Sequence, residues 1–306
     1  MLRFILMRSI QMLIALLVLS IVVFGVVRIH GDPALLFLPP DSTEQDYQRV
    51  RRNLGLDRPV YAQYGLFLSG AVRGNFGNSI YTGRPVLSSI KEAFPNSFWL
   101  VLVSMITGLA LSIPLGVLAA ANKGKTIDTF ARMAAALGQS LPSFWVALIA
   151  MQLFAVYLGI LPTSGTGSWR HYVLPVGCLT FFIMPGPVRL VRSSMLEVLD
   201  TEYIRFARVK GLPKRVILWK HALRNSLLPV LGFSAVQLAF MITGAVVIET
   251  VYAWPGLGRL AFRAISSQDF PMIQGVVLVT AFVVILANLV ADIFYALVDP
   301  RIRLKA

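Results

Sequence analysis

Residues 93–122, AFPNSFWLVLVSMITGLALSIPLGVLAAAN, decide the fold because they form a run of 30 residues without a charged side chain. A helix that crosses the hydrocarbon core of a membrane needs about 20 mostly apolar residues, so this run predicts one transmembrane helix. Five further uncharged runs each have room for one span: 9–27, 133–169, 171–188, 225–248 and 270–291. The run at 133–169 ends in LPTSGTGS, so we expect it to hold one helix and one loop. Kinks are expected at four prolines: Pro114, Pro142, Pro185 and Pro187.

The composition agrees with lipid as the main solvent of the chain. Apolar residues make up 57% of the 306 residues, charged residues only 14%, and the mean hydropathy is +0.73. Soluble domains are about 45–50% apolar and about 25% charged, so an ordinary soluble domain is excluded. The formal net charge of +14 suggests nucleic acid, but charges this sparse cannot line a groove continuously. We therefore predict an all-α integral membrane protein with six transmembrane helices, in contact with lipid and not with nucleic acid.

Basic residues are unevenly divided between the two sides of the predicted membrane. Six crossings place both termini on one side. The termini and the second and fourth loops hold 17 Lys and Arg residues, whereas the two short loops opposite hold three. Because an excess of basic residues marks the cytoplasmic side, we expect both termini in the cytoplasm and the long first loop outside.

This topology divides the chain into four parts. We expect an N-terminal anchor helix at residues 1–28, a small external subdomain between the first two helices at 29–92, a transmembrane core at 93–298 with a cytoplasmic loop at 189–224, and a cytoplasmic tail at 299–306. The first helix is expected to be retained, because no small-x-small cleavage site follows it. A helix is expected near residues 41–54, with Asp41 or Ser42 as its cap.

No motif in the sequence supplies catalytic chemistry. Gly124-Lys125-Thr126 matches the end of a phosphate-binding loop, but the first glycine of that loop would fall on Ala119, inside a span. GLGRLA at residues 256–261 lacks the strand and helix that a dinucleotide-binding turn needs. The single cysteine and the histidines are scattered: Cys178, His30, His171 and His221. We expect a chain that is not an enzyme and binds no cofactor or metal.

The predicted spans also contain few of the charges that mark an ion-coupled carrier. Glu249 and Asp292 lie near the ends of their helices, and we interpret them as boundary residues. The fifth run places polar and small residues on one helical stripe: Ser234, Gln237, Met241 and Gly244. Facing lipid, the amide of Gln237 would lack a partner, so the stripe is expected to face either a wet pathway or a neighbouring helix. The pattern leaves both interpretations open.

The cytoplasmic loop at residues 189–224 has more local order than a tether requires. Asp200 and Thr201 are residue types that suit the start of a helix. The predicted helix covers residues 203–210, and Gly211 followed by Leu-Pro suits its end. A short helix along the membrane surface is therefore expected.

This short helix has two open interpretations. It would expose Ala207 and Gly211, four residues apart on one face, where the backbone of another protein can come close. The alternative is a basic segment held at the lipid surface by three cations: Arg205, Arg208 and Lys210.

Several short motifs occur together along the whole chain. They are Ala207-x3-Gly211, HALRN at residues 221–225 followed by Pro229, GDPA at 31–34, LGLD at 54–57 followed by Pro59, WPGLGRL at 254–260, and D-x-P-x-IQG at 269–275. In this order they resemble the permease subunits of bacterial ABC importers of the peptide and nickel permease family, and within it the first, B-type, permease. The chain departs from the family pattern at four places: Arg205-Phe206, where importers generally have Glu-Ala; Pro229, which comes later than the terminal proline of the general pattern; Asn75, where aspartate is usual; and His30, where proline is usual.

The resemblance implies a fold like that of type I ABC importer permeases and a subunit of an ATP-driven importer in the bacterial inner membrane. It implies a paralogous second permease in a heterodimer, two ATPase subunits that hold ATP and Mg, and an extracytoplasmic solute-binding protein. The ATPase would dock on the short loop helix, with contacts at Tyr203, Ala207, Arg208, Lys210 and Gly211. The solute stays open among dipeptides, oligopeptides, nickel complexes and glutathione-like or opine-like molecules. An ion-coupled secondary carrier without ATPase partners and a scaffold that transports nothing are the alternatives.

Overall fold

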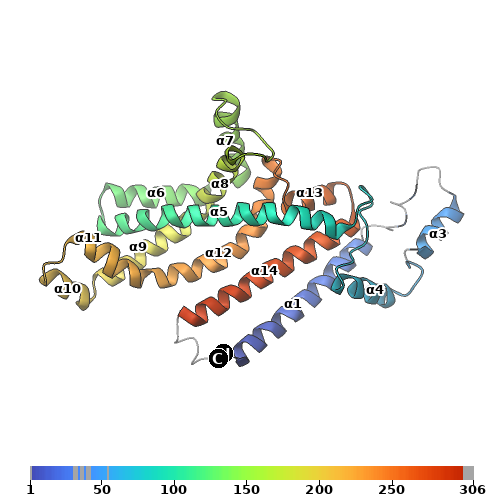
Figure 1. The fold of residues 1–306 in the computed structure, drawn as a ribbon, viewed down its shortest axis with the longest axis horizontal. Helices are drawn as coiled ribbons and strands as arrows, with labels where there is room; N and C mark the ends of the chain where they lie inside the picture. Colours follow the sequence, from blue (N-terminus) through green and yellow to red (C-terminus); the bar gives the residue numbers. More distant parts are fainter. Residues whose placement is uncertain (1, 30–33, 35–37, 39–42, 54, 299–306) are drawn as a thin grey trace. The chain divides into compact units, whose positions relative to one another are not determined.

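The computed structural model describes residues 2–29, 34, 38, 43–53 and 55–298 (Figure 1). These residues form helices and one isolated antiparallel bridge, between Asn78 and Pro85. The helices group into two compact units, Leu2–Asn96 with Pro255–Ile285, and Ser97–Trp254 with the described residues from Leu286 on. The predicted tail at 299–306 lies outside the described residues.

The unit formed by Leu2–Asn96 and Pro255–Ile285 contains the following helices in whole or in part: α1 (Leu2–Ile29), α3 (Glu44–Asn53), α4 (Val60–Val72), α5 (Val86–Ala121), α13 (Leu257–Ser266) and α14 (Phe270–Val298). Its apolar core joins α5, α13 and α14: Val86, Ile90, Ala93, Leu257, Ala264, Met272 and Val276. The buried carboxylate of Asp269 accepts hydrogen bonds from the Ser79 hydroxyl and from the backbone N–H groups of Ile80 (3.2 Å) and Met272 (3.3 Å). This carboxylate fixes the loop before α5 to the start of α14.

The start of α3 differs from the prediction. The hydroxyl of Thr43 donates to the carboxylate of Asp46 (2.6 Å) and accepts from the backbone N–H of Asp46 (3.3 Å). Reciprocal bonds of this kind satisfy donors at a helix start. Thr43 therefore caps the helix; the expected caps, Asp41 and Ser42, lie outside the described residues.

The unit around Ser97–Trp254 holds the remaining helices, two of them π-helices, in this order: α6 (Thr126–Ser140), α7 (Ser143–Ala150), η1 (Met151–Tyr157), α8 (Trp169–Ile183), α9 (Pro185–Leu199), α10 (Glu202–Val209), α11 (Lys214–Val216), η2 (Ile217–Ala222) and α12 (Leu223–Val251). Helix α9 packs against both α12 and α6 (Figure 1). Helix α10 lies at the end of this group and contacts α9 and η2.

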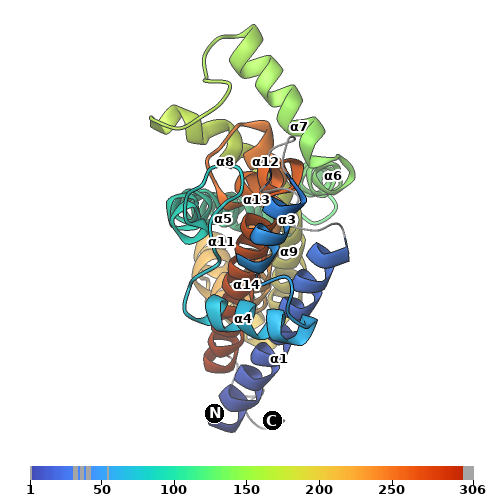
Figure 2. The same cartoon turned by 90° about the vertical axis from the view of Figure 1, so that its right-hand side faces the viewer.

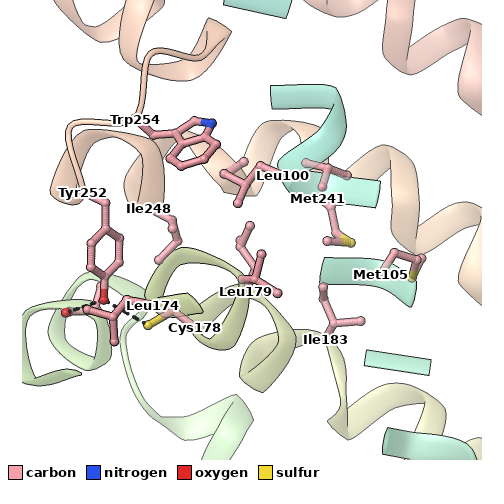
Figure 3. Close-up of a cluster of buried hydrophobic side chains, with 14 residues drawn as sticks. Leu100, Met105, Leu174, Cys178, Leu179, Ile183, Met241, Ile248, Tyr252 and Trp254 are labelled. Atoms are coloured by element: carbon pink, nitrogen blue, oxygen red, sulfur yellow. Dashed lines mark hydrogen bonds between the residues drawn. The ribbon is translucent and has the colours of Figure 1, made fainter. Parts of the chain in front are cut away.

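The larger apolar core of this unit is closed by aromatic residues that follow α12 (Figure 3). The hydroxyl of Tyr252 donates to the backbone oxygen of Ala147 (2.9 Å) and lies 3.4 Å from the sulfur of Cys178. The Trp254 ring meets the Tyr172 ring edge to face, with 4.6 Å between the centroids. Cys178 is therefore a buried core residue.

Four helical stretches of the described chain are long and apolar enough to cross a membrane: Leu6–Val27, Val86–Ala121, Lys214–Val251 and Phe270–Ile293. Two bent pairs pass the same test together, α6 with α7 and η1, bent by 105°, and α8 with α9, bent by 44° (Figure 2). The chain is thus an all-helical membrane protein with four candidate spans, or six if each bent pair is one span.

The prediction of a single helix in the run at 133–169 is wrong. The chain turns between α6 and α7 at Leu141-Pro142, because proline lacks an N–H and disfavours helical backbone at the residue before it. The loop predicted over residues 161–168 is confirmed. Helix α5 continues unbroken through Pro114.

Candidate functional site

The loop at residues 189–224 contains the short helix that its sequence predicts, α10, and the end of this helix is sharply defined. Gly211 has a φ of +76°, in the left-handed region that glycine enters without a Cβ penalty. The backbone N–H of Leu212 donates to the oxygen of Ala207 (3.2 Å), and that of Gly211 donates to the oxygen of Arg208 (3.0 Å). This pair of bonds is the Schellman motif, so the prediction of a terminating glycine is confirmed.

The two faces of α10 have different surroundings. Ile204 and Ala207 are buried in a cluster with Ile217 and Leu218 of η2. The expectation that Ala207 is exposed beside Gly211 is therefore wrong, because the cluster covers its side chain. The opposite face exposes 66% of Phe206 and 85% of Val209. This apolar face was not predicted, although the spacing of three residues between Phe206 and Val209 indicates that the two share one side of a helix.

Tyr203 attaches α10 to the chain that follows. Its hydroxyl donates to the backbone oxygen of His221 in η2 (3.4 Å) and accepts a hydrogen bond from the side-chain amide of Asn225 (2.8 Å). The hydrogen-bond pattern of a π-helix leaves carbonyls available, and such turns often occur at functional sites. The HALRN motif thus contributes two of the groups that position the helix.

Charged residues surround the exposed face of α10. Arg205 pairs with Glu202 (2.8 Å) and Asp200 (3.6 Å), all three at the surface. Arg208 donates to the backbone oxygen of Leu199 at the end of α9 (3.3 Å). Lys210 and Gly211 are exposed, and no atom lies within 4 Å of the place a Cβ on Gly211 would take.

Beside the helix lies a cavity of about 620 Å³. Its walls include three cations, Lys123, Arg208 and Lys214, one acid, Asp200, and apolar side chains of α9 and η2. The surface around α10 therefore combines exposed apolar side chains with positive charge, a combination that suits a protein partner.

A buried ion pair holds α9, which leads into α10, against α6. The carboxylate of Asp128 is 1% exposed and accepts from Nε of Arg192 (2.5 Å) and from a terminal nitrogen of the same guanidinium (2.9 Å). The backbone N–H of Gly124 donates to it as well (2.9 Å). No local sequence pattern predicts this pair, because its members are 64 positions apart.

The stripe predicted on α12 does not have one environment. Ser234 and Met241 are buried inside the unit, and the Ser234 hydroxyl donates to the oxygen of Val230 (2.7 Å). Gln237 is half-buried and Gly244 is exposed. Burial of Ser234 and Met241 agrees with the packing interpretation for those two residues. A pathway role for any of the four stays a prediction.

Glu249 carries a buried carboxylate near the end of α12. It is 1% exposed within α12, and the Ser97 hydroxyl donates to its carboxylate (2.5 Å). It lies two residues before the end of α12 at Val251, which agrees with the interpretation of a boundary residue, although its burial was not expected. In the part of the chain described, no three His, Cys, Asp or Glu residues come together as a metal site.

Comparison with known proteins places the chain in a family. The family "Binding-protein-dependent transport system inner membrane component" matches residues 112–304, and its N-terminal companion, "Binding-prot-dependent transport system membrane comp, N-term", matches residues 1–103. Both descriptions are of a transport component, which confirms the expectation of a chain that is not itself an enzyme. The family implies ATPases, a binding protein and a second permease as partners.

Relatives and solved structures agree with this placement. The glutathione transport system permease proteins GsiC of Escherichia coli K12 and of Salmonella typhimurium LT2 are each 37% identical to the chain over 306 residues, covering all of both chains. A structure of the MetNI methionine ABC transporter in an inward-facing conformation matches 69% of this chain and 96% of its own, with a TM-score of 0.57 and 19% identity, which supports the fold alone. With the two family matches, these likenesses show that the chain belongs to the inner-membrane permease components of binding-protein-dependent ABC transporters, in the peptide and nickel family.

Proposed function

We propose that this chain is one half of the translocation pathway of an ATP-driven importer, and that an ATPase subunit docks on the exposed face of α10. The observation that carries the docking proposal is the pair Phe206 and Val209, two apolar side chains exposed on a charged helix that has no other partner in the unit for that face. A partner that covers both would gain about 25 cal/mol for each Å² of apolar area removed from water.

The contacts of α10 give a path for force. A pull on α10 acts on α9 through Ile204 and Ala207 and on η2 through Tyr203. The buried ion pair between Arg192 and Asp128 connects α9 to α6, so a movement of α9 would also displace α6. When ATP binding closes the ATPase pair, α10 would thus move together with α9, η2 and α6. This movement would switch the pathway between inward-facing and outward-facing states.

The proposal includes the finer topology. Each bent pair counts as one span, giving six, with both termini cytoplasmic, the subdomain at 29–92 external and the loop at 189–224 as the coupling loop. The partners are a paralogous permease, two ATPase subunits with ATP and Mg, and an extracytoplasmic binding protein. Gln237 and Gly244 are the stripe residues proposed to meet the pathway; a cysteine at Gly244 that stays unreactive toward a water-soluble thiol reagent in every nucleotide state would contradict this.

The solute proposed is a small peptide or peptide-like molecule. Glutathione is the first candidate because the GsiC relatives are named for its transport and match the chain over its full length. Mass spectrometry of the ligand that copurifies with the cognate binding protein tests this assignment, and a ligand without a peptide bond would contradict it.

Phe206→Asp tests the docking role. The substitution removes the apolar area that the docked ATPase would bury, and it forces a carboxylate out of water when the ATPase docks. We therefore expect severalfold less ATPase to copurify with the permease and ATP-dependent uptake to be severalfold slower. Phe206→Leu is the matched control and should keep most of both. Thermal unfolding, followed through the reaction of buried Cys178 with a thiol-reactive dye, should be the same in both variants.

If membranes that contain the Phe206→Asp variant take up solute as fast as the unaltered protein, the assignment of α10 as the docking surface is contradicted. Substituting Gly211 instead is a less direct test, because its φ of +76° adds backbone strain to any effect on docking.

An ion-coupled carrier is the second candidate, and Glu249 is the observation that favours it. A carboxylate 1% exposed within a membrane-spanning stretch is a residue type used in proton relays. If the chain works as a carrier, an ionophore should abolish uptake, Glu249→Gln should do the same, and removing the ATPase subunits should leave uptake unchanged. If it works as proposed, only removal of the ATPase subunits should stop uptake.

A further inference from the structure

Helix α4, in the segment expected to lie outside the membrane, has an unusual composition for a helix in water. Its 13 residues, VYAQYGLFLSGAV, include no charged side chain, and none of them is buried. Val60, Tyr61, Leu66 and Val72 are each more than half exposed. At about 1.5 Å per residue the helix is about 20 Å long, too short to cross a bilayer.

The contacts of α4 place it beside a membrane-spanning helix. The hydroxyl of Tyr64 lies 2.8 Å from the hydroxyl of Ser20 on α1. The ring of Phe24 on α1 packs on the rings of Tyr64 and Phe67, with centroids 5.5 and 5.6 Å apart. Figures 1 and 2 both draw α4 alongside α1.

The positions of these contacts along α1 set a depth. Ser20 and Phe24 lie inside the apolar stretch Leu6–Val27. Ser20 is seven residues before Val27, which corresponds to about 10 Å along a helix. The middle of α4 is therefore well below the end of the span, at a level where lipid surrounds α1.

The space that α4 encloses is apolar as well. A cavity of about 760 Å³ opens between α1, α4 and α14, and its wall includes Leu13, Leu17, Leu68, Val72, Leu278 and Phe282. Ser20 contributes the one polar side chain among the residues that line it. The apolar wall of this cavity is continuous with the exposed apolar surface of α1. That surface includes four side chains that are 46–67% exposed: Leu13, Ile14, Leu17 and Val18.

Charges are found only just beyond the two ends of α4. Arg58 lies two residues before the helix and Arg73 directly follows it. Tyr61, near the start of α4, supplies a ring of the kind enriched at the boundary between lipid and water. Helices of this type lie in the interface with their apolar side chains in the acyl region and cations at the headgroups.

Helix α3 provides the contrast within the same segment. Its sequence, EQDYQRVRRN, has five charged residues in ten. Such a helix cannot enter the acyl region without a large desolvation cost, so it belongs in water.

We propose that α4 is embedded in the half of the bilayer at the Val27 end of α1, and that phospholipid acyl chains cover its exposed face and enter the cavity between α1, α4 and α14. This half is the external one under the topology proposed above. The embedding itself rests on the uncharged composition of α4 and on its contacts with α1, and not on the direction of transport.

Spin-label accessibility of the full-length chain in phospholipid nanodiscs tests the proposal. In a Cys178→Ser background, single cysteines replace Tyr61, Leu66 or Val72, and Arg49→Cys in α3 is the control. We expect collisions with lipid-soluble oxygen to exceed those with a water-soluble nickel chelate at the α4 sites, and the reverse in α3. The ratio of the two should be several times higher in α4.

Two results would overturn the proposal. Nickel collisions in α4 as frequent as those in α3 would place the helix in water. Protection from both reagents, measured with the partner permease present, would mean that protein and not lipid covers it. A chain that transports nothing could still give the expected result, so failure of the importer assignment and failure of this proposal are distinguishable.

Discussion

Helices α10 and α4 are both too short to span a membrane, and both expose apolar side chains, yet they differ in what surrounds those side chains. In α10, Phe206 and Val209 stand among arginines and acids on a helix whose other face is buried. In α4 there is no charge, and neither face is buried. The difference teaches that exposed apolar residues indicate a protein partner when charges keep the helix in water, and lipid when charges are absent.

The two helices also differ in how they are held. Helix α10 is fixed by a Schellman motif, by Ile204 and Ala207 in an apolar cluster, and by the Tyr203 hydroxyl. Helix α4 is held by one pair of hydroxyl groups and a few aromatic contacts with α1. A helix that transmits force needs the first kind of attachment, whereas a helix supported by lipid does not.

The largest effect is expected from the ion pair beneath α10. Arg192→Ala leaves the buried Asp128 carboxylate without its main partner and should lower the free energy of unfolding by about 3 kcal/mol, the lower end of the usual range because Arg192 is partly exposed. The exposed Arg189 on the same helix is the control, and Arg189→Ala should change stability by less than about 0.5 kcal/mol. Thermal unfolding, followed through Cys178 reactivity, measures both; equal midpoints would show that the pair does not hold α9.

A pair of glycine substitutions should have opposite signs in the two helices. Gly211→Ala places a Cβ on left-handed backbone at the end of α10 and should destabilise by about 1 kcal/mol. Gly65→Ala, inside α4 with no atom within 4 Å of the new Cβ, should stabilise by about 0.5–1 kcal/mol through backbone entropy. The same thermal measurement compares them, and a shift in one direction for both would contradict the assigned backbone conformations.

The smallest effect is expected from the surface charges of α10. Arg205→Ala removes ion pairs with Glu202 and Asp200, but all three side chains are more than half exposed, so stability should change by less than about 0.5 kcal/mol. Uptake should fall far less than in Phe206→Asp. A loss of uptake as large as that of Phe206→Asp would mean that charge, and not the apolar face, recruits the partner.

The spans could be located from the sequence because hydropathy is a local property, and each apolar run contains helix. A kink at Pro142 could be predicted as well, but its size of 105° could not, since prolines do not always break helices: α5 passes through Pro114 without interruption. What a proline does depends on which neighbours accept the freed carbonyls, and that is a property of the tertiary structure.

In the candidate site, the end of α10 could be predicted but not its orientation. Gly211 signals its own conformation, whereas the burial of Ala207 depends on Ile217 and Leu218 after an intervening turn. Asp128 and Glu249 are buried by contacts with residues 64 and 152 positions away, which no local pattern contains. Contacts over such distances are decided by how helices pack.

The turn between α6 and α7 changes the direction in which motion can travel along the chain. At 105° the axis of α7 is closer to perpendicular than to parallel to that of α6, so a displacement of α6 along its own axis has only a small component along α7. Such a displacement would carry α7 and η1 mainly sideways, across their own axes. A push along α6 would therefore leave this corner as a lateral movement.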